Sequence, residues 1–253
     1  MIRGWNVRYS EIVKEFGFNK NQDYESAFLL DSMIREPVPI EKIKGIINGK
    51  DVFVVGAGPS LASSIDILKK FKKNPKIVAD SAVHILIKNG ITPDIVVTDL
   101  DGNEQALKKI GKTKTVMIVH AHGDNITKLH LVENFKNVLG TTQGKPFNKL
   151  FNFGGFTDGD RCVFLAHAFN AKKIILFGMD FENKIGFFSN TKKTDLRIKR
   201  KKLRWAKILL EWVAKKSNCK FYTTSKAIKG VKKIRFKYLV YIILFYRFFI
   251  YLL

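Results

Sequence analysis

A repeated alternation of short apolar runs with helical stretches, between residues 51 and 224, constrains this chain more than any other feature. Runs such as Ile174-Ile175-Leu176-Phe177 are apolar at every position, which is typical of strands buried on both faces of a parallel sheet. We therefore predict an α/β fold: a Rossmann-like, mainly parallel sheet with helices on both faces. The expected strands are 51–55, 76–80, 94–101, 115–124, 138–141, 150–153, 173–180 and 220–224, and the expected helices are 61–73, 81–89, 104–110, 125–134, 158–170 and 195–216.

The predicted α/β domain spans residues 46–228, and a segment of different character lies on each side of it. Residues 1–45 have helical spacing of their apolar positions, which predicts a short helical N-terminal extension. The segment after Met1 is polar and mixed, unlike a signal peptide, so we expect a cytoplasmic protein. Residues 229–253 form a tail that is first basic and then apolar and aromatic.

The last part of this tail, residues 236–253, suits attachment to an anionic membrane surface, because aromatic and aliphatic side chains follow a basic stretch. It is short for a membrane span, which needs about 20 residues. The alternatives are a final helix or strand packed on the domain, or an extension unrelated to function.

The charge of the chain is strongly unbalanced, with 45 Lys and Arg residues against 22 Asp and Glu residues and a net charge of +23. Such an excess favours anionic partners such as nucleotides, nucleic acid or an acidic membrane. A basic protein that binds nucleic acid or membrane would explain the charge and the tail but not the acidic residues described next, so we expect no nucleic-acid partner. The two cysteines, Cys162 and Cys219, form no CxxC pair, and nothing supports a zinc or redox site.

Aspartates stand at the ends of four predicted strands, at positions 80, 99 and 101, 124, and 180. The carboxyl ends of parallel strands share one edge of the sheet, which is where ligands bind in such folds. Carboxylates gathered in one place repel one another and usually hold cations, of which Mg²⁺ is bound by one or two carboxylates together with substrate phosphates. Asp99 and Asp101 are two residues apart, so in an extended segment they would point the same way and could share one ion. The alternative is that each Asp caps a turn or helix.

Two glycine-containing segments could contact a ligand. Gly56-Ala57-Gly58-Pro59-Ser60 follows a strand and precedes a helix, so its amides could cradle phosphate, or it could be a tight turn only. A full GxGxxG would need glycine at position 61, which is leucine. In residues 152–161, Thr157 and Asp160 fit a capping box, while Phe153 and Phe156 beside two glycines could stack on a flat ring.

Two further groups of residues have both a functional and a structural interpretation. His120 and His122 alternate on one predicted strand and could bind metal, contact substrate or pack at the strand end. Residues 192–204 are rich in Lys and Arg, and they could neutralise a phosphate chain or form a solvated helix face.

Five segments together resemble the archaeal 6-hydroxymethyl-7,8-dihydropterin diphosphokinases. They are residues 54–61, 93–102, 120–125, 156–161 and 177–181, within a region of similarity from about residue 50 to about residue 225. The segment 93–102 is also similar to the acidic segment of thiamine diphosphokinases. The resemblance implies ATP-dependent transfer of diphosphate to a reduced pterin alcohol, with release of AMP, in pterin biosynthesis of the tetrahydromethanopterin or folate type. Residues 236–253 do not follow the family pattern.

The resemblance and the strand-end pattern together suggest roles for individual residues. Asp99 and Asp101 would bind Mg²⁺, and Asp80, Asp124 or Asp158 would complete the shell or act as the base. The proposed contacts to ATP are Gly56, Gly58, Ser60, Lys199, Arg200 and Arg204, with Lys202 on the same helix. The turn of residues 56–60 could hold the pterin instead of the nucleotide. The proposed contacts to the pterin are His122, Phe156 and Asp160. The alternative function is a metal-dependent glycosyltransferase, because Asp99-Leu100-Asp101 is also the DxD motif that binds nucleotide sugars.

Overall fold

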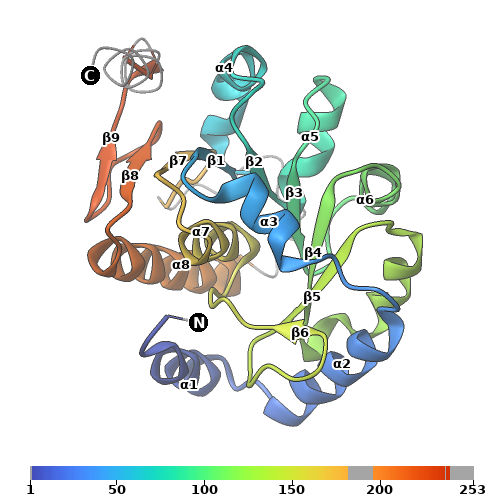
Figure 1. Ribbon diagram of the computed structural model, residues 1–253. Helices are drawn as coiled ribbons and strands as arrows, with labels where there is room; N and C mark the ends of the chain where they lie inside the picture. Colours follow the sequence, from blue (N-terminus) through green and yellow to red (C-terminus); the bar gives the residue numbers. More distant parts are fainter. Residues whose placement is uncertain (1, 182–195, 237, 240–253) are drawn as a thin grey trace.

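A nine-stranded sheet, parallel throughout, forms the centre of the protein in the computed structural model, which describes residues 2–181, 196–236 and 238–239 (Figure 1). The strand order is β6-β5-β4-β3-β2-β1-β7-β8-β9. The strands are β1 (Asp51–Val55), β2 (Lys76–Ala79), β3 (Ile95–Thr98), β4 (Val116–Ala121), β5 (Val138–Thr142), β6 (Leu150–Phe151), β7 (Lys173–Phe177), β8 (Lys220–Thr223) and β9 (Val231–Lys233).

Helices cover both faces of this sheet. The helices are α1 (Trp5–Phe16), α2 (Lys20–Met33), α3 (Ile40–Ile47), η1 (Pro59–Ser64), α4 (Ile65–Lys70), η2 (Asp80–Ala82), α5 (Val83–Lys88), α6 (Glu104–Gly111), η3 (Gly123–Asn134), α7 (Asp158–Ala168) and α8 (Leu196–Lys216). Successive strand residues alternate between two cores: Val52 and Val54 pack with α1, α3, α7 and α8, whereas Phe53 and Val55 pack with α2, α4, α5, α6 and η3. The predicted fold, an α/β sheet covered on both faces with a short helical extension before it, is confirmed.

Several elements differ from the sequence-based expectation. The short helix α3 directly follows Pro39, which we had expected to end the helical extension, and proline is a favourable residue at a helix start. The segment expected as an α-helix over 125–134 is the 3-10 helix η3. Strand β9 pairs in register with β8, so the sheet continues past the expected domain boundary at residue 228.

The first residues of the tail belong to the packed protein. Ile234 and Leu239 are buried, and Phe236 packs against the same core as α4 and α5. The rest of the tail, from residue 240, lies outside the described residues, and the predicted membrane attachment stays a prediction. Within the described part of the chain, no helix is long and apolar enough to cross a membrane.

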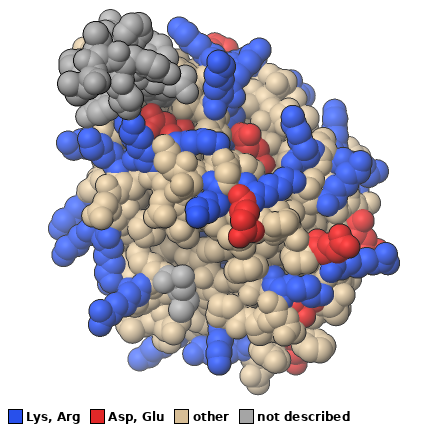
Figure 2. Space-filling view, in the orientation of Figure 1, with Lys and Arg blue, Asp and Glu red and all other residues tan. Residues whose placement is uncertain are grey.

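The strand order reverses next to β1, and this reversal marks a place for a ligand. From β1 the chain moves outward through β2, β3, β4 and β5 to β6, and then crosses back to place β7 on the other side of β1. In open parallel sheets the loops that follow the strands part at such a reversal and leave a crevice at the carboxyl ends. Basic side chains outnumber acidic ones, as Figure 2 shows for one face, so a group of acidic side chains stands out.

Candidate active site

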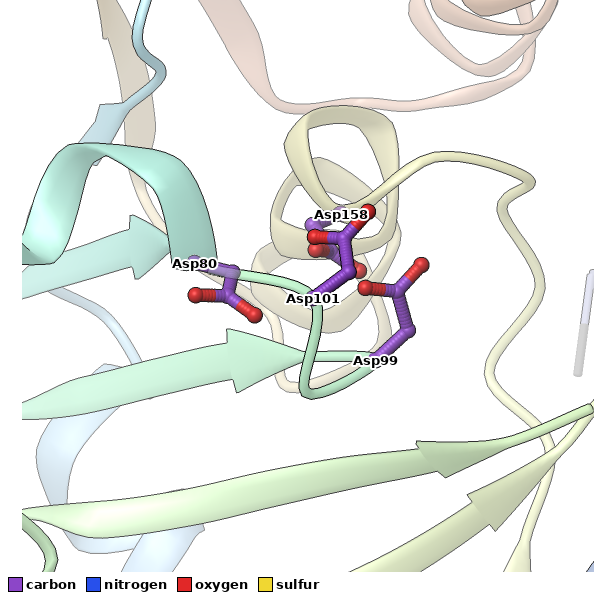
Figure 3. A group of neighbouring side chains, drawn as sticks. All are labelled: Asp80, Asp99, Asp101 and Asp158. Carbon is purple, nitrogen blue, oxygen red and sulfur yellow. The ribbon is translucent and has the colours of Figure 1, made fainter. Parts of the chain in front are cut away.

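Four aspartates meet at the carboxyl ends of β2 and β3 and at the first turn of α7 (Figure 3). They are Asp80, Asp99, Asp101 and Asp158, each with a carboxylate oxygen within 4.8 Å of one from every other member. We call these four residues the carboxylate cluster. The strand-end pattern of the sequence therefore predicted a real group, although Asp158 reaches it from a helix and not from a strand.

The turn after β3 brings Asp99 and Asp101 together in a way that the sequence did not indicate. Strand β3 ends at Thr98, and Leu100 has a left-handed backbone with φ of 67°. The two aspartates thus share a site because of a turn, and our assumption of an extended segment was wrong. The hydroxyl of Thr98 accepts a hydrogen bond from the Leu100 amide at 2.8 Å, which holds the turn.

A glycine allows the loop to approach the buried carboxylate of Asp80. The Gly102 amide donates to Asp80 Oδ2 at 3.2 Å, and the Thr98 hydroxyl donates to the same oxygen. A Cβ atom at Gly102 would overlap the buried carboxylate of Asp80, so a larger residue would have to displace that side chain. This contact therefore favours glycine at residue 102, independently of any backbone strain.

Asp99 is the member of the cluster that stays ionised. Burial alone would raise its pKa, but the hydrogen bond from His122, together with the charge of Arg161, holds the pKa of Asp99 well below its usual range. His122 Nε2 lies 3.4 Å from Asp99 Oδ2. His122 Nδ1 accepts from the Asp124 amide, so the ring proton is on the nitrogen that faces Asp99.

The other three carboxyl groups hold their protons more tightly than usual. Burial, followed by the charge of Asp99, raises the pKa of Asp80 to about 7. Desolvation and the same neighbour raise the pKa of Asp101 to about 6. Burial and Asp99 raise the pKa of Asp158 well above its usual value, although the Arg161 guanidinium lies 3.1 Å away and opposes the shift.

The cluster fits a hard divalent cation. Within the described residues, Asp80 Oδ1 and Asp99 Oδ1 are buried and have no hydrogen-bond partner. Buried carboxylate oxygens without partners are costly unless a cation satisfies them. An all-oxygen donor set is the kind that Mg²⁺ prefers, and among the described residues no histidine or cysteine belongs to this group.

The raised pKa values predict how stability changes with pH when no cation is present. Between about pH 4 and pH 7 the folded protein binds more protons than the unfolded chain, whose carboxyl pKa values are near 4. Stability in a chelator should therefore fall as the pH rises through this window, and the melting temperature should drop by several degrees. Millimolar Mg²⁺ should remove most of the fall.

Thermal melts from pH 4.5 to 8, in chelator and in Mg²⁺, measure this effect. Asp80→Asn should flatten the chelator curve, whereas Asp66→Asn, at an exposed position on α4, should leave it unchanged. A chelator curve that rises between pH 5 and 7 in the parent protein would contradict the prediction.

The glycine turn after β1 forms a wall of a pocket, but its amides are already used. The amide of Gly58 donates to the Gly178 carbonyl at 2.7 Å, and that of Gly56 donates to Phe177. The Ser60 amide and hydroxyl both donate to Asp180 Oδ2 at 2.9 Å. These three amides thus already have partners within the protein, two backbone carbonyls and the Asp180 carboxylate, and the contact of Gly56, Gly58 and Ser60 with phosphate stays a prediction. Asp180 is occupied in the same contact and lies outside the carboxylate cluster.

The glycine turn is one side of a pocket that lies at the strand-order reversal, between the ends of β1 and β7. We call it the β1–β7 pocket; its walls are residues 56–59, 156–159 and 178–181, the two aspartates 99 and 101, and one face of α8. From α8, Lys199 and Lys202 line it, together with Leu203 and Ala206. Among the described residues, the lining does not include Arg200 or Arg204. Arg204 instead pairs with Glu15 of α1 at 2.7 Å.

Other residues expected at the site lie beside the cluster. Asp124 is 71% exposed and follows His122 on the rim, outside the cluster. Asp160 is fully buried, and its carboxylate accepts from the Thr157 hydroxyl at 2.7 Å and the Phe156 amide at 3.1 Å. It completes the capping box of α7, as in the structural alternative, and does not line the β1–β7 pocket. Phe156 does line that pocket.

The two histidines have different places. His120 is buried, donates to or accepts from the Thr141 hydroxyl at 3.0 Å, and has a pKa lowered well below its usual value by burial. It is a packed residue behind the site, whereas His122 contacts Asp99. Phe153 packs against Phe151 and Phe169 and does not line the β1–β7 pocket, so it does not offer its ring to a flat ligand there as we had considered.

Arg161, Thr98 and Asn125 contact members of the carboxylate cluster, and the sequence reasoning gave them no role. Arg161 is buried beside Asp158, and Asn125 donates to the carbonyl oxygens of Asp99 and His120. Arg161 could have been found, because it follows three acidic or capping residues at the start of a helix. Thr98 and Asn125 lie in the segments 93–102 and 120–125, but their contacts to Asp80 and Asp99 join parts of the chain that are 18 and 26 residues apart, so no role could be assigned to them from the sequence.

Comparison with known proteins places the chain among related sequences. Residues 30–186 match the family described as "6-hydroxymethylpterin diphosphokinase MptE-like". The chain is 43% identical over 237 residues to the 6-hydroxymethyl-7,8-dihydropterin pyrophosphokinase of Methanocaldococcus jannaschii, with 87% of this chain and 98% of the relative covered. It is 45% identical over 225 residues to the protein of that name from Pyrococcus furiosus, covering 85% and 95%.

A third relative, from Methanothermobacter thermautotrophicus and of the same name, is 37% identical over 219 residues, which are 84% of this chain and 94% of the relative. Among solved structures, the MAf glycosyltransferase from Magnetospirillum magneticum is similar, with a TM-score of 0.56 and 15% identity. The similarity covers 78% of this chain, and the chain spans 37% of that structure. At this identity the likeness shows the fold alone.

Proposed function

The chain belongs to the MptE-like family of 6-hydroxymethylpterin diphosphokinases, and from this membership and the carboxylate cluster we propose its reaction. It transfers diphosphate from ATP to the hydroxymethyl group of 6-hydroxymethyl-7,8-dihydropterin and releases AMP, in pterin biosynthesis of the tetrahydromethanopterin or folate type. The observation that carries the proposal is the cluster at the mouth of a pocket that also presents lysines.

The chemistry asks mainly for positioning and for stabilised charge. The pterin hydroxyl oxygen forms a bond to the β-phosphorus, and the bond from that phosphorus to the oxygen that stays on AMP breaks. Asp99 and Asp101, with Asp80 beside them, would hold Mg²⁺, which when bound neutralises charge on the phosphate oxygens. Asp158 lines the same pocket, and its raised pKa suits it to take the hydroxyl proton.

The decisive experiment is a product analysis. The protein is incubated with ATP, Mg²⁺ and the reduced pterin alcohol, and the nucleotide and pterin products are separated and identified. AMP and the pterin diphosphate, formed in equal amounts and only with Mg²⁺ present, are expected. ADP would indicate simple phosphate transfer, and metal-dependent binding of a nucleotide sugar without ATP turnover would indicate the glycosyltransferase alternative.

The position of Lys199 predicts a specific effect on ATP. Lys199 lines the β1–β7 pocket. Desolvation and the charge of Asp99 raise the pKa of Asp101, and the nearby charge of Lys199 opposes part of that rise. Lys199→Ala should raise the KM for ATP about tenfold, because a charge-assisted contact to phosphate is lost. The KM for the pterin should stay within about twofold of the parent value, because the variant loses no contact to the pterin and the loss of one ordinary hydrogen bond would change it by more.

Arg200→Ala and Arg204→Ala are the matched controls, since they change neighbouring basic residues on α8 that do not line the pocket. Steady-state kinetics with each substrate varied in turn provide the measurement. An equal rise in the KM for ATP in all three variants would mean that the basic helix attracts ATP only through its overall charge.

A further inference from the structure

A second pocket adjoins the carboxylate cluster at Asp99. It lies where the connection between α1 and α2 faces the start of η3, and we call it the α1–α2 pocket. Phe18 and Asn19 of the connection, Gln22 of α2, Gln143 after β5 and His122 line it. Asp99, Phe156 and Lys202 line both pockets, so the two are joined at the cluster.

The two pockets differ in the groups that they offer. The β1–β7 pocket lies at the strand-order reversal and presents Lys199 beside the cluster, as a phosphate chain requires. The α1–α2 pocket presents the amide group of the exposed Gln22, which can donate and accept hydrogen bonds. Arg161 also lines this pocket, but it is buried and paired with Asp158, and it donates to the Gln143 side chain. The exposed Asp124 carboxylate at its rim would repel phosphate and accept from N–H groups.

Aromatic rings complete the α1–α2 pocket. The centroid of Phe18 lies 6.0 Å from that of Phe156 and 5.3 Å from that of Phe16. Such rings provide faces on which a flat heterocycle can stack. The wall is also firmly held: the Asp23 carboxylate accepts from the Tyr9 hydroxyl at 2.6 Å and the Gly123 amide at 2.8 Å, which ties α2 to α1 and η3.

We propose that the α1–α2 pocket binds the flat, neutral heterocyclic alcohol that accepts the diphosphate, while ATP occupies the β1–β7 pocket, and that Phe18 and Gln22 determine acceptor specificity. This inference rests on the proposed function. A transfer between two substrates needs two pockets that meet at the reacting phosphorus, and Asp99 belongs to both. The N-terminal extension, residues 1–45, then contributes residues to the acceptor site.

Equilibrium binding tests which pocket holds which substrate, and it does so without requiring the transfer reaction. The probes are 6-hydroxymethyl-7,8-dihydropterin and α,β-methylene-ATP, whose bridging carbon prevents transfer, each titrated calorimetrically in Mg²⁺. Gln22→Met keeps the side-chain length and removes its hydrogen bonds, and Phe18→Leu keeps an apolar side chain and removes the ring. Glu25→Gln, at an exposed position on α2 that lines neither pocket, is the control.

Each of the two variants should weaken pterin binding by on the order of five- to tenfold, the loss expected for one hydrogen bond or one ring contact. Both should bind the ATP analogue as the parent does, and Lys199→Ala should show the opposite pattern. Unchanged pterin binding in both variants, or weakened binding of the ATP analogue alone, would overturn the division of the pockets. The parent protein separately tests the proposed function, because AMP formation there does not depend on which pocket holds the pterin.

Discussion

Replacing Asp101 with asparagine should lower the rate of diphosphate transfer by on the order of 10³-fold, which corresponds to several kcal/mol of transition-state stabilisation. Asparagine keeps the size of the side chain and removes one negative ligand from the carboxylate cluster. The stability should not fall in chelator, because desolvation and the Asp99 charge already disfavour the ionised form of this carboxyl and raise its pKa to about 6. The variant should melt at the parent temperature or above it.

Two measurements made on the same preparation test this expectation: AMP formation in saturating Mg²⁺, and thermal unfolding in chelator at pH 8. Asp66→Asn is the control for the loss of one aspartate charge at an exposed position. Strong destabilisation with normal activity would mean that Asp101 is a structural cap of its turn. Parent-like activity with unchanged stability would remove Asp101 from the metal site.

Replacing Arg161 with methionine should have the largest effect on stability, a loss of about 3–5 kcal/mol at neutral pH, as is typical when one partner of a buried ion pair is removed. The Arg161 side chain is 7% exposed and lies 3.1 Å from Asp158, and its charge also lowers the pKa of Asp99. Without it, these carboxylates are buried without a fixed cation. The loss should be smaller at pH 5, because protons can then neutralise part of the cluster.

Denaturant unfolding at pH 7.5 and pH 5, in chelator, measures this loss. Arg204→Met is the matched control, because Arg204 is 62% exposed and its pair with Glu15 is the kind of surface ion pair that contributes less than about 1 kcal/mol. A parent-like stability of Arg161→Met at pH 7.5 would show that the neighbouring carboxyl groups are already neutral in the fold and that Arg161 is not their counter-ion.

The sheet could be predicted from the sequence because its strands are apolar on both faces. Runs such as 51–55 and 173–177 leave no helical alternative of sufficient length, and the turns between them are marked by Gly, Pro and Asp. Strand β9 was missed because its sequence is Val231-Lys232-Lys233, with two exposed lysines, as expected of an edge strand. Strand β9 is held in the sheet by its pairing with β8, and three residues are too short to show a periodic pattern in the sequence.

The membership of the carboxylate cluster was predicted only in part, because Asp124 and Asp180 lie outside it and Asp158 joins it from a helix. Strand ends of a parallel sheet share an edge whatever their details, so Asp80, Asp99 and Asp101 could be grouped from sequence. The left-handed backbone at Leu100 has no sequence signal such as glycine. The partners of the Gly56, Gly58 and Ser60 amides, which are Phe177, Gly178 and Asp180, lie more than 100 residues further along the chain. Asp160 is a local case: its buried carboxylate completes the capping box of its own helix, which was the structural interpretation of the sequence.

The place of β1 in the sheet has a consequence for the protein while it is being synthesised. β1 is paired with β2 on one side and with β7 on the other, yet 117 residues separate the end of β1 at Val55 from the start of β7 at Lys173. A growing chain can pair β1 to β6 long before β7 leaves the ribosome, and during that time the free edge of β1 is an apolar strand open to other chains. Lys199 and Lys202, which line the β1–β7 pocket, emerge later still. The nascent chain is therefore exposed to aggregation at the strand beside which the finished protein has its pocket.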